Sequence, residues 1–123
     1  KKKELLTHLE LKVMNILWKL KKAFVKDIIQ VWPDANKTHT NTVSTTIRIL
    51  ESKNYVGHKA YGRSHEYFPK ISKFAYQKRL LGNIIDNAFA GSITSLVSAL
   101  VDNEKISDEE LDEIQELINK NKE

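Results

Sequence analysis

The chain has 123 residues, with a hydrophobic content of 41% and a charged content of 29%. This composition is typical of a folded globular protein and argues against general disorder. The chain holds no cysteine, which excludes disulfides, thiolate metal sites and cysteine nucleophiles. No apolar run approaches the length of about 20 residues that a membrane-spanning helix needs. The N-terminal KKKELL lacks the apolar core of a secretion signal, so we expect neither secretion nor membrane insertion.

The charge is divided unevenly along the chain. Residues 1–82 hold 17 Lys or Arg and 6 Asp or Glu, a balance of +11. Residues 83–123 hold 3 Lys or Arg and 10 Asp or Glu, a balance of −7. A basic first part and an acidic tail indicate a polyanionic partner for the first part only. The alternative is a charge asymmetry without a function.

The first predicted helix begins at a capping-box pattern, in which Thr7 is the N-cap and Glu10 reaches back to it. Two apolar stripes follow on this helix, which predicts burial on two sides. The first stripe is Leu9, Val13, Ile16, Leu17 and Leu20, and the second is Leu11, Met14 and Trp18. A second, short helix is expected from about Phe24 to Trp32, where Pro33 ends it.

The third predicted helix begins at about Thr40 and has two opposed faces. Val43, Ile47 and Leu50 recur at i, i+4 and i+7 and form an apolar stripe. The opposite face carries short hydrogen-bonding side chains, one arginine and no acidic residue, namely Asn41, Ser44, Thr45, Arg48 and Ser52. Side chains of this kind can reach base edges and phosphates in a DNA major groove. The alternative is an ordinary solvated helix face. Asn54 then closes the helix, since asparagine tolerates the left-handed conformation.

Two short aromatic-rich runs, 55–60 and 65–69, flank the turn-forming tetrapeptide Tyr61-Gly62-Arg63-Ser64. This pattern predicts a β-hairpin with Arg63 at its tip and Lys59 close by. Three helices followed by a hairpin make a winged helix-turn-helix. In that arrangement the third helix enters the major groove, and the hairpin lies along the backbone or the minor groove. The expected fold class is therefore mainly α with a small β-hairpin.

From Ser72 the sequence is helical to the end. The predicted helices run from Lys73 to about Ala90, from a cap at Ser92, and from a second capping box that begins at Ser107. We expect residues 1–71 to form a winged-helix DNA-binding domain and residues 72–123 a C-terminal helical dimerisation domain. About 50 residues make a poor independent core, and a two-fold dimer would bury their apolar faces. The alternative is a monomer whose tail folds back on the first domain.

The candidate dimerisation residues are the apolar positions that repeat along these three helices. They are Leu81, Ile84, Ile85, Ala88, Leu96, Val97, Leu100, Leu111, Ile114, Leu117 and Ile118.

The candidate DNA-binding residues gather at the start and on the outer face of the third helix and on the hairpin. They are Lys37, His39, Thr40, Asn41, Thr42, Ser44, Thr45, Arg48, Lys59 and Arg63. Arg48 is the best single candidate for a base or phosphate contact. Thr40, Thr42 and the backbone N–H groups at the helix start are expected to bind phosphate, whereas Asn41 could instead serve as a local cap.

The four histidines, at positions 8, 39, 58 and 65, show no pair at metal-ligand spacing. His58 and His65 could face each other across the hairpin. The sequence has no Gly-rich phosphate loop, nucleophile elbow or zinc-peptidase motif. We therefore expect no catalytic residue, no metal and no cofactor.

Several blocks of the sequence, in the right order, resemble the BlaI/MecI penicillinase-repressor family. The segment 7–18 resembles its first-helix signature, 42–56 its recognition helix and first strand, 62–63 its wing tip, 67–69 its closing strand and 91–97 its dimerisation region. The match covers nearly the whole chain. The resemblance implies a dimeric, cytoplasmic bacterial repressor that binds an inverted-repeat operator in double-stranded DNA.

Members of that family control β-lactam-resistance genes or, in a copper-responsive branch, copper transport. In the antibiotic-responsive branch a membrane sensor peptidase is a partner, and the repressor is cut at an Asn-Phe bond in its dimerisation helix. This chain has Ala99-Leu100 at the cleavage-equivalent position, so we expect no such cut. The copper-responsive members carry paired cysteines, which this chain lacks.

One departure from the family concerns the third helix. Ser44 stands where the antibiotic repressors have an arginine. This difference motivates an alternative function, a winged-helix adaptor that binds other proteins and has lost DNA binding. A protected inverted repeat in a footprint of the upstream DNA would exclude the adaptor.

Overall fold

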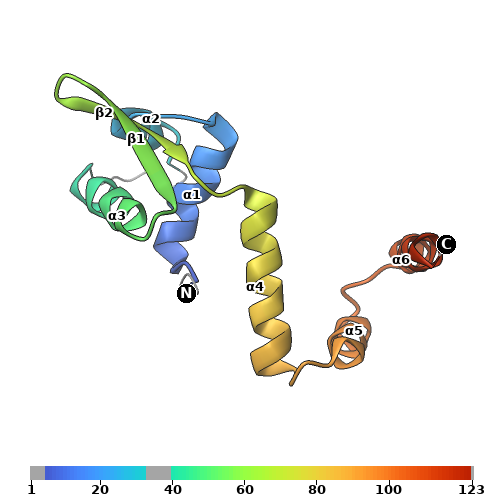
Figure 1. Cartoon of the computed structure of the whole chain (residues 1–123). Coiled ribbons are helices and arrows are strands. Elements are labelled where there is room, and N and C mark those ends of the chain that lie inside the picture. Colours follow the sequence, from blue (N-terminus) through green and yellow to red (C-terminus); the bar gives the residue numbers. More distant parts are fainter. Residues whose placement is uncertain (1–4, 33–39, 123) are drawn as a thin grey trace. The chain divides into compact units, whose positions relative to one another are not determined.

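The computed structural model of the chain describes residues 5–32 and 40–122 (Figure 1). Within these residues the chain forms six helices and one antiparallel hairpin, which confirms the predicted fold class. The elements are α1 (His8–Leu20), α2 (Val25–Gln30), α3 (Thr40–Ser52), β1 (Val56–Tyr61), β2 (Ser64–Pro69), α4 (Lys73–Ala88), α5 (Ile93–Asp102) and α6 (Asp108–Asn121). They divide into two compact units, Lys1–Arg79 and Leu80–Glu123.

The predicted capping box opens α1. The Thr7 hydroxyl accepts a hydrogen bond from the Glu10 backbone N–H at 3.2 Å, and the Glu10 carboxylate accepts one from the Thr7 N–H at 2.9 Å. Helix α1 is buried on one side by Val13, Met14 and Leu17. The predicted first stripe is only partly buried, because Leu9 and Leu20 at its ends remain 36% and 38% exposed.

Helix α2 is shorter than predicted. It spans Val25–Gln30 and begins where the Phe24 N–H donates to the Asp27 carboxylate at 3.0 Å. The expected end at Trp32 is wrong because Val31 already leaves the helical conformation. The predicted role of Pro33 lies outside the described residues.

Helix α3 buries the predicted stripe of Val43, Ile47 and Leu50. Thr46 is buried with them, and its hydroxyl donates to the Thr42 carbonyl at 2.7 Å. A buried hydroxyl needs such a partner. Asn54, which follows the helix, has a φ of 70°, the left-handed conformation predicted for it.

The hairpin has the predicted register, with Val56 opposite Pro69 and Tyr61 opposite Ser64. A further backbone bridge links β2 to the residue before α2. The Ala23 N–H donates to the Tyr67 carbonyl at 2.9 Å, and the Tyr67 N–H donates to the Ala23 carbonyl at 2.8 Å. The bridge holds the base of the hairpin, here called the wing, against the helical part of the unit.

The first turns of α4 pack within the N-terminal unit. The buried Tyr76 ring lies 6.1 Å from the Tyr55 ring and 6.0 Å from the Trp18 ring, measured between centroids. Its hydroxyl accepts a hydrogen bond from the Leu6 N–H at 3.1 Å, and the Trp18 indole donates to the Ile71 carbonyl at 2.9 Å. Trp18, of the second predicted stripe of α1, is therefore in contact with α4.

The compact units divide at Arg79, within α4, whereas the predicted domain boundary precedes this helix. The assignment of the two parts to DNA binding and dimerisation stays a prediction.

The C-terminal unit begins its helices at the predicted caps. Ser92 accepts a hydrogen bond from the Ser95 N–H, and Ser107 forms a complete capping box with Glu110. Helix α4 ends at Ala88, two residues before the predicted end, and φ is positive at Ala90 and Gly91. Neither α5 nor α6 contains a buried residue.

No single described helix is long and apolar enough to cross a membrane, although α4 and α5 together meet the length and composition of a broken span.

Candidate nucleic-acid interface

The outer face of α3 is exposed as predicted, because the opposite face is anchored in the core. Thr40, Asn41 and Thr42 are exposed in its first turn. Thr45 and Arg48 are exposed further along, and Ser44 is half-buried beside them. The predicted contacts of Lys37 and His39 lie outside the described residues.

The wing contributes the two basic residues that the sequence placed there. Lys59 and Arg63 are both exposed. The Lys59 ammonium lies 5.4 Å from the centre of the Tyr61 ring, a distance typical of a cation–π contact. Arg63 follows Gly62, whose φ of 64° forms the tight turn at the tip.

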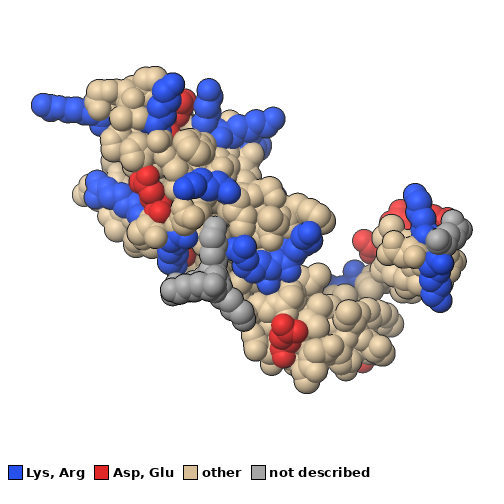
Figure 2. All heavy atoms as spheres, in the orientation of Figure 1, with Lys and Arg blue, Asp and Glu red and all other residues tan. Residues whose placement is uncertain are grey.

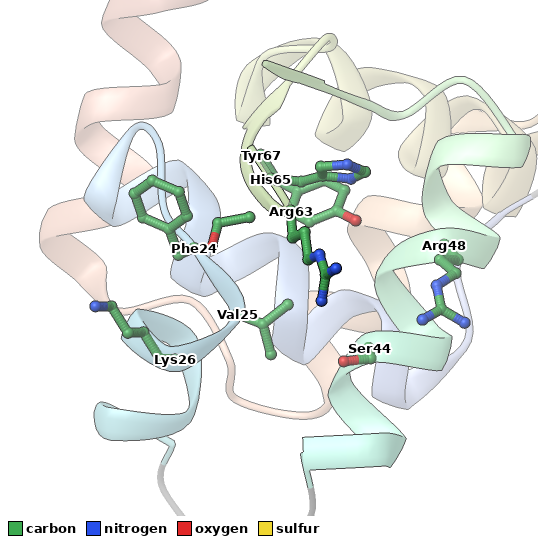
Figure 3. A pocket seen from close by; sticks show the side chains of 9 residues that line it. Phe24, Val25, Lys26, Ser44, Arg48, Arg63, His65 and Tyr67 are labelled. Atoms are coloured by element: carbon green, nitrogen blue, oxygen red, sulfur yellow. The ribbon is translucent and has the colours of Figure 1, made fainter. Parts of the chain in front are cut away.

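The structure brings three of the predicted residues together around one hollow, which we call the basic hollow. Ser44 and Arg48 of α3 and Arg63 of the wing line it, and its volume is about 380 Å³. The remaining lining residues are Phe24, Val25, Lys26, Ser64, His65 and Tyr67. In Figure 3 the Arg63 side chain reaches into the space between α2 and α3. Cationic side chains from three separate elements thus surround one space that is open to solvent.

Lys26 and His65 line the basic hollow but were not among the sequence candidates. The helix before the recognition helix crosses the DNA backbone in helix-turn-helix proteins. A lysine on that predicted helix, such as Lys26, could therefore have been named as a candidate from the sequence. No local pattern distinguishes His65, whose position depends on how the wing is held against α2 and α3.

One wall of the basic hollow continues into a cluster of polar rings. His58 and His65 stack with their ring centres 4.0 Å apart and their planes 8° apart, which confirms that they face each other across the hairpin. The His58 ring nitrogen Nδ1 lies 2.5 Å from a carboxylate oxygen of Glu51. Burial raises the pKa of the neighbouring Tyr67 phenol, and the Glu51 carboxylate adds to this rise while Arg48 opposes it.

The arrangement of the ring cluster differs from that of a metal site. Among the described residues, no group of three or more His, Cys, Asp or Glu side chains is arranged to hold a metal ion. Two stacked parallel rings also direct their in-plane lone pairs side by side rather than toward one point.

Basic side chains are spread over the N-terminal unit. On the face drawn in Figure 2, Lys and Arg side chains outnumber Asp and Glu side chains over this unit. Such a surface attracts polyanions over a distance comparable to the Debye length, about 8 Å at physiological salt. The charge division seen in the sequence therefore corresponds to a basic surface on the folded unit.

The candidate dimerisation residues all lie on α4, α5 and α6. Most of them are exposed within the single chain, and Ile85, Leu96 and Leu100 are half-buried. The exposed positions are Leu81, Ile84, Ala88, Val97, Leu111, Ile114, Leu117 and Ile118. The cleavage-equivalent pair, Ala99 and Leu100, is half-buried within α5.

The family model of the penicillinase repressors matches residues 6–120 of the chain. The chain belongs to the penicillinase repressor family. It is 27% identical to the methicillin resistance regulatory protein MecI of Mammaliicoccus sciuri over 111 residues, which are 90% of this chain and 90% of the relative. It is 24% identical to the penicillinase repressor of Bacillus licheniformis over 113 residues, which are 92% of this chain and 88% of the relative.

A solved structure supports the same assignment. The solution structure of the DNA-binding domain of the repressor BlaI matches with a TM-score of 0.52 and 26% sequence identity, covering 59% of this chain and 89% of that one. The resemblance inferred from the sequence blocks is thus confirmed. The family consists of transcriptional regulators, so this chain is a regulator and not an enzyme.

Proposed function

We propose that this DNA-binding transcriptional repressor acts as a homodimer on an inverted-repeat operator in double-stranded DNA. In this proposal α3 enters the major groove, and the wing lies against the backbone or the minor groove. The observation that carries the proposal is the exposed polar face of α3 beside the basic hollow, where Arg48 and Arg63 share one space.

The chemistry of the α3 face suits a mixed base and phosphate contact. Arg48 can form two parallel hydrogen bonds to guanine or to a phosphate. The hydroxyls of Ser44 and Thr45 are short and can reach base edges or backbone oxygens only if the helix lies deep in the groove. The exposed first turn of α3 adds backbone N–H groups and the threonine hydroxyls of Thr40 and Thr42, which favour a phosphate.

The proposed dimer rests on the apolar surface of the C-terminal unit. Its helices α5 and α6 contain no buried residue in the single chain. Leu117 is 64% exposed and Val97 is 40% exposed. Burying such side chains against a second copy would be favourable by about 25 cal/mol for each Å² removed from water. A two-fold dimer would present two copies of α3 to two half-sites.

The proposal also covers the class of genes that the repressor controls and the partner that signals to it. The names of the two relatives refer to methicillin resistance and penicillinase, which supports control of genes of the β-lactam-resistance type in the cytoplasm. A membrane sensor peptidase is a further proposed partner. We propose that it does not act by cutting between Ala99 and Leu100, since this pair differs from the Asn-Phe bond cut in the antibiotic-responsive members.

Footprinting of the DNA upstream of the chain's own gene tests the function. We expect a protected inverted repeat, and affinity for a labelled duplex of that sequence should fall steeply as salt rises, because phosphate contacts release counterions. Arg48→Ala should weaken binding about 10-fold to 100-fold, as expected for loss of one good bidentate contact. Arg79→Ala is the matched control, because Arg79 is exposed but does not line the basic hollow.

The competing adaptor function predicts a different outcome. An adaptor would give no protected sequence, and its residual DNA affinity would not distinguish Arg48→Ala from Arg79→Ala. The departure at Ser44 is the observation that favours it. A protected inverted repeat whose binding depends on Arg48 excludes it.

A further inference from the structure

The stacked histidines add a titratable group to the basic hollow. His65 lines the hollow together with Arg48 and Arg63, and its ring stacks on that of His58 with the ring centres 4.0 Å apart. Histidine is the side chain whose ordinary pKa, about 6.5, lies closest to physiological pH. A change of pH can therefore change the charge of the hollow without any change in fold.

We propose that the basic hollow binds one backbone phosphate of the operator, and that His65 takes up a proton when it does so. DNA binding is then linked to pH and becomes tighter as the pH falls. This inference rests on the proposed function and adds a regulation to the same surface.

The charged groups around His65 determine the direction of the link. Lys26 of α2, Arg48 of α3 and Arg63 of the wing are cations that line the same hollow. Glu51 of α3 is an anion at the same ring stack, where His58 contacts it.

Glu51, His58 and Tyr67 are the other titratable groups in contact with the histidine stack. The Glu51 carboxylate lies within hydrogen-bond distance of the His58 ring. Two positively charged rings at this stacking distance would repel each other, and an anion beside the stack would offset that repulsion. The phenol of Tyr67 also contacts both rings, with centroid distances of 5.7 and 6.1 Å, but its raised pKa keeps it neutral.

A backbone phosphate supplies that anion on the open side of the stack. Its negative charge favours a proton on the His65 ring, which then becomes a third donor beside Arg48 and Arg63. Binding affinity and proton affinity must then change by the same factor, since the linkage is reciprocal. For uptake of one proton, the dissociation constant falls at most about 10-fold for each pH unit.

The test measures the affinity of the full chain for the labelled duplex between about pH 5.5 and pH 8 at constant salt. We expect the wild-type dissociation constant to fall by about 3-fold to 10-fold for each pH unit in the steepest part of this range. His65→Gln should flatten the response. His65→Arg should give tight binding that no longer depends on pH, because it carries a fixed charge.

Three control variants separate His65 from the other histidines. His8→Gln, at the exposed start of α1, should keep the wild-type pH response. If His39→Gln abolishes the slope and His65→Gln does not, the proposal is overturned. His58→Gln should retain proton uptake, since His65 remains beside the hollow.

The source of the phosphate is tested in the same assay. Inorganic phosphate, added at constant ionic strength, should leave duplex binding unchanged; competition by inorganic phosphate would identify a free anion as the occupant and overturn the proposal. Duplex binding that is normal at every pH, with the same affinity for wild type and His65→Gln, would overturn the inference and leave the proposed function standing. Failure to bind the duplex at any pH would instead overturn the proposed function.

Discussion

The ammonium group of Lys53 lies 3.0 and 3.1 Å from the two carboxylate oxygens of Glu10. This ion pair joins the residue after α3 to the first turn of α1. The Glu10 carboxylate also accepts the Thr7 N–H that closes the capping box. Glu10 is only 5% exposed, so one buried carboxylate both starts α1 and holds the end of the proposed recognition helix.

The Glu10 carboxylate makes stability depend on acid pH. Burial alone would raise the pKa of Glu10, but the Thr7 N–H and the Lys53 ammonium outweigh it and lower the pKa below its usual value. A lowered folded-state pKa gives a stabilisation that is complete above the unfolded-state value of about 4.3 and is lost as the pH falls through the folded-state value. The N-terminal unit should therefore lose stability as the pH falls below about 4.

The variant Glu10→Gln isolates the charge, because glutamine can still complete a capping box. It should lower the free energy of unfolding at pH 7 by about 1–2 kcal/mol and reduce the acid dependence. Urea unfolding at neutral and acid pH measures both effects. Glu66→Gln on the wing is the control and should leave both close to wild type. An acid dependence that is the same in wild type and Glu10→Gln would contradict the prediction.

The hydroxyl of Tyr76 should contribute a measurable part of the anchoring of α4. Tyr76→Phe removes the acceptor for the Leu6 N–H but keeps the ring packed against Tyr55 and Trp18. We expect a loss of about 1 kcal/mol, against about 3–5 kcal/mol for Tyr76→Ala, which also leaves a cavity. Thermal unfolding measures this, with the exposed Tyr61→Phe as control. Equal effects of Tyr76→Phe and Tyr76→Ala would show that ring packing contributes little.

Two glycines of the wing should respond differently to alanine. The described residues leave open space where a Cβ added at Gly62 would lie, but its φ of 64° is unfavourable for other residues, so Gly62→Ala should cost about 1 kcal/mol. At Gly57 an added Cβ would meet the tip of the Phe68 ring at 2.9 Å. Phe68 is 40% exposed and can rotate away, so Gly57→Ala should cost less. Thermal unfolding of the two variants measures both losses of stability. A larger loss for Gly57→Ala than for Gly62→Ala would contradict the prediction.

A charge on the apolar face of α6 should disrupt the proposed dimer. Leu117→Glu places a carboxylate at an exposed leucine that we expect the second copy to bury. Sedimentation velocity should then give a monomer where the wild type gives a dimer. Gln115→Glu is the control, because Gln115 already carries a polar side chain on the same helix, hydrogen-bonded to Asn119. A wild-type monomer, or a Leu117→Glu dimer, would contradict the proposed interface.

The bond between Ala99 and Leu100 should stay intact during induction. Mass spectrometry of the repressor from induced cells measures this, and a product that ends at Ala99 would contradict the prediction. The double substitution Ala99→Asn with Leu100→Phe restores an Asn-Phe bond at this position. If a suitable sensor peptidase is present, that variant should be cut in the same cells, and this provides the matched control.

The features that the sequence predicted correctly are local. Both capping boxes, the buried stripe of α3 and the tight turn at Gly62 each depend on residues within a few positions of one another. The order of the family blocks then identified the family. The end of α2 was misplaced because its apolar pattern continues to Trp32, although the backbone leaves the helix at Val31.

The features that could not be predicted are contacts between distant positions. The Lys53–Glu10 ion pair and the Ala23–Tyr67 bridge carry no periodicity that a sequence reveals. The basic hollow is another example, because Lys26 and His65 reach it only after the wing folds against α2 and α3. The prediction therefore found the elements that present the site but missed two side chains that help to form it.

The Ala23–Tyr67 bridge also determines where related repressors can accept insertions in the wing. Its two hydrogen bonds fix the wing at its base, whereas at the tip no described residue comes within 4 Å of a Cβ added at Gly62. Insertions at the tip could lengthen the wing without shifting the helices, and thereby extend the DNA footprint by small steps. Insertions below the bridge would displace α2 instead, so new binding specificities should accumulate at the far end of the hairpin.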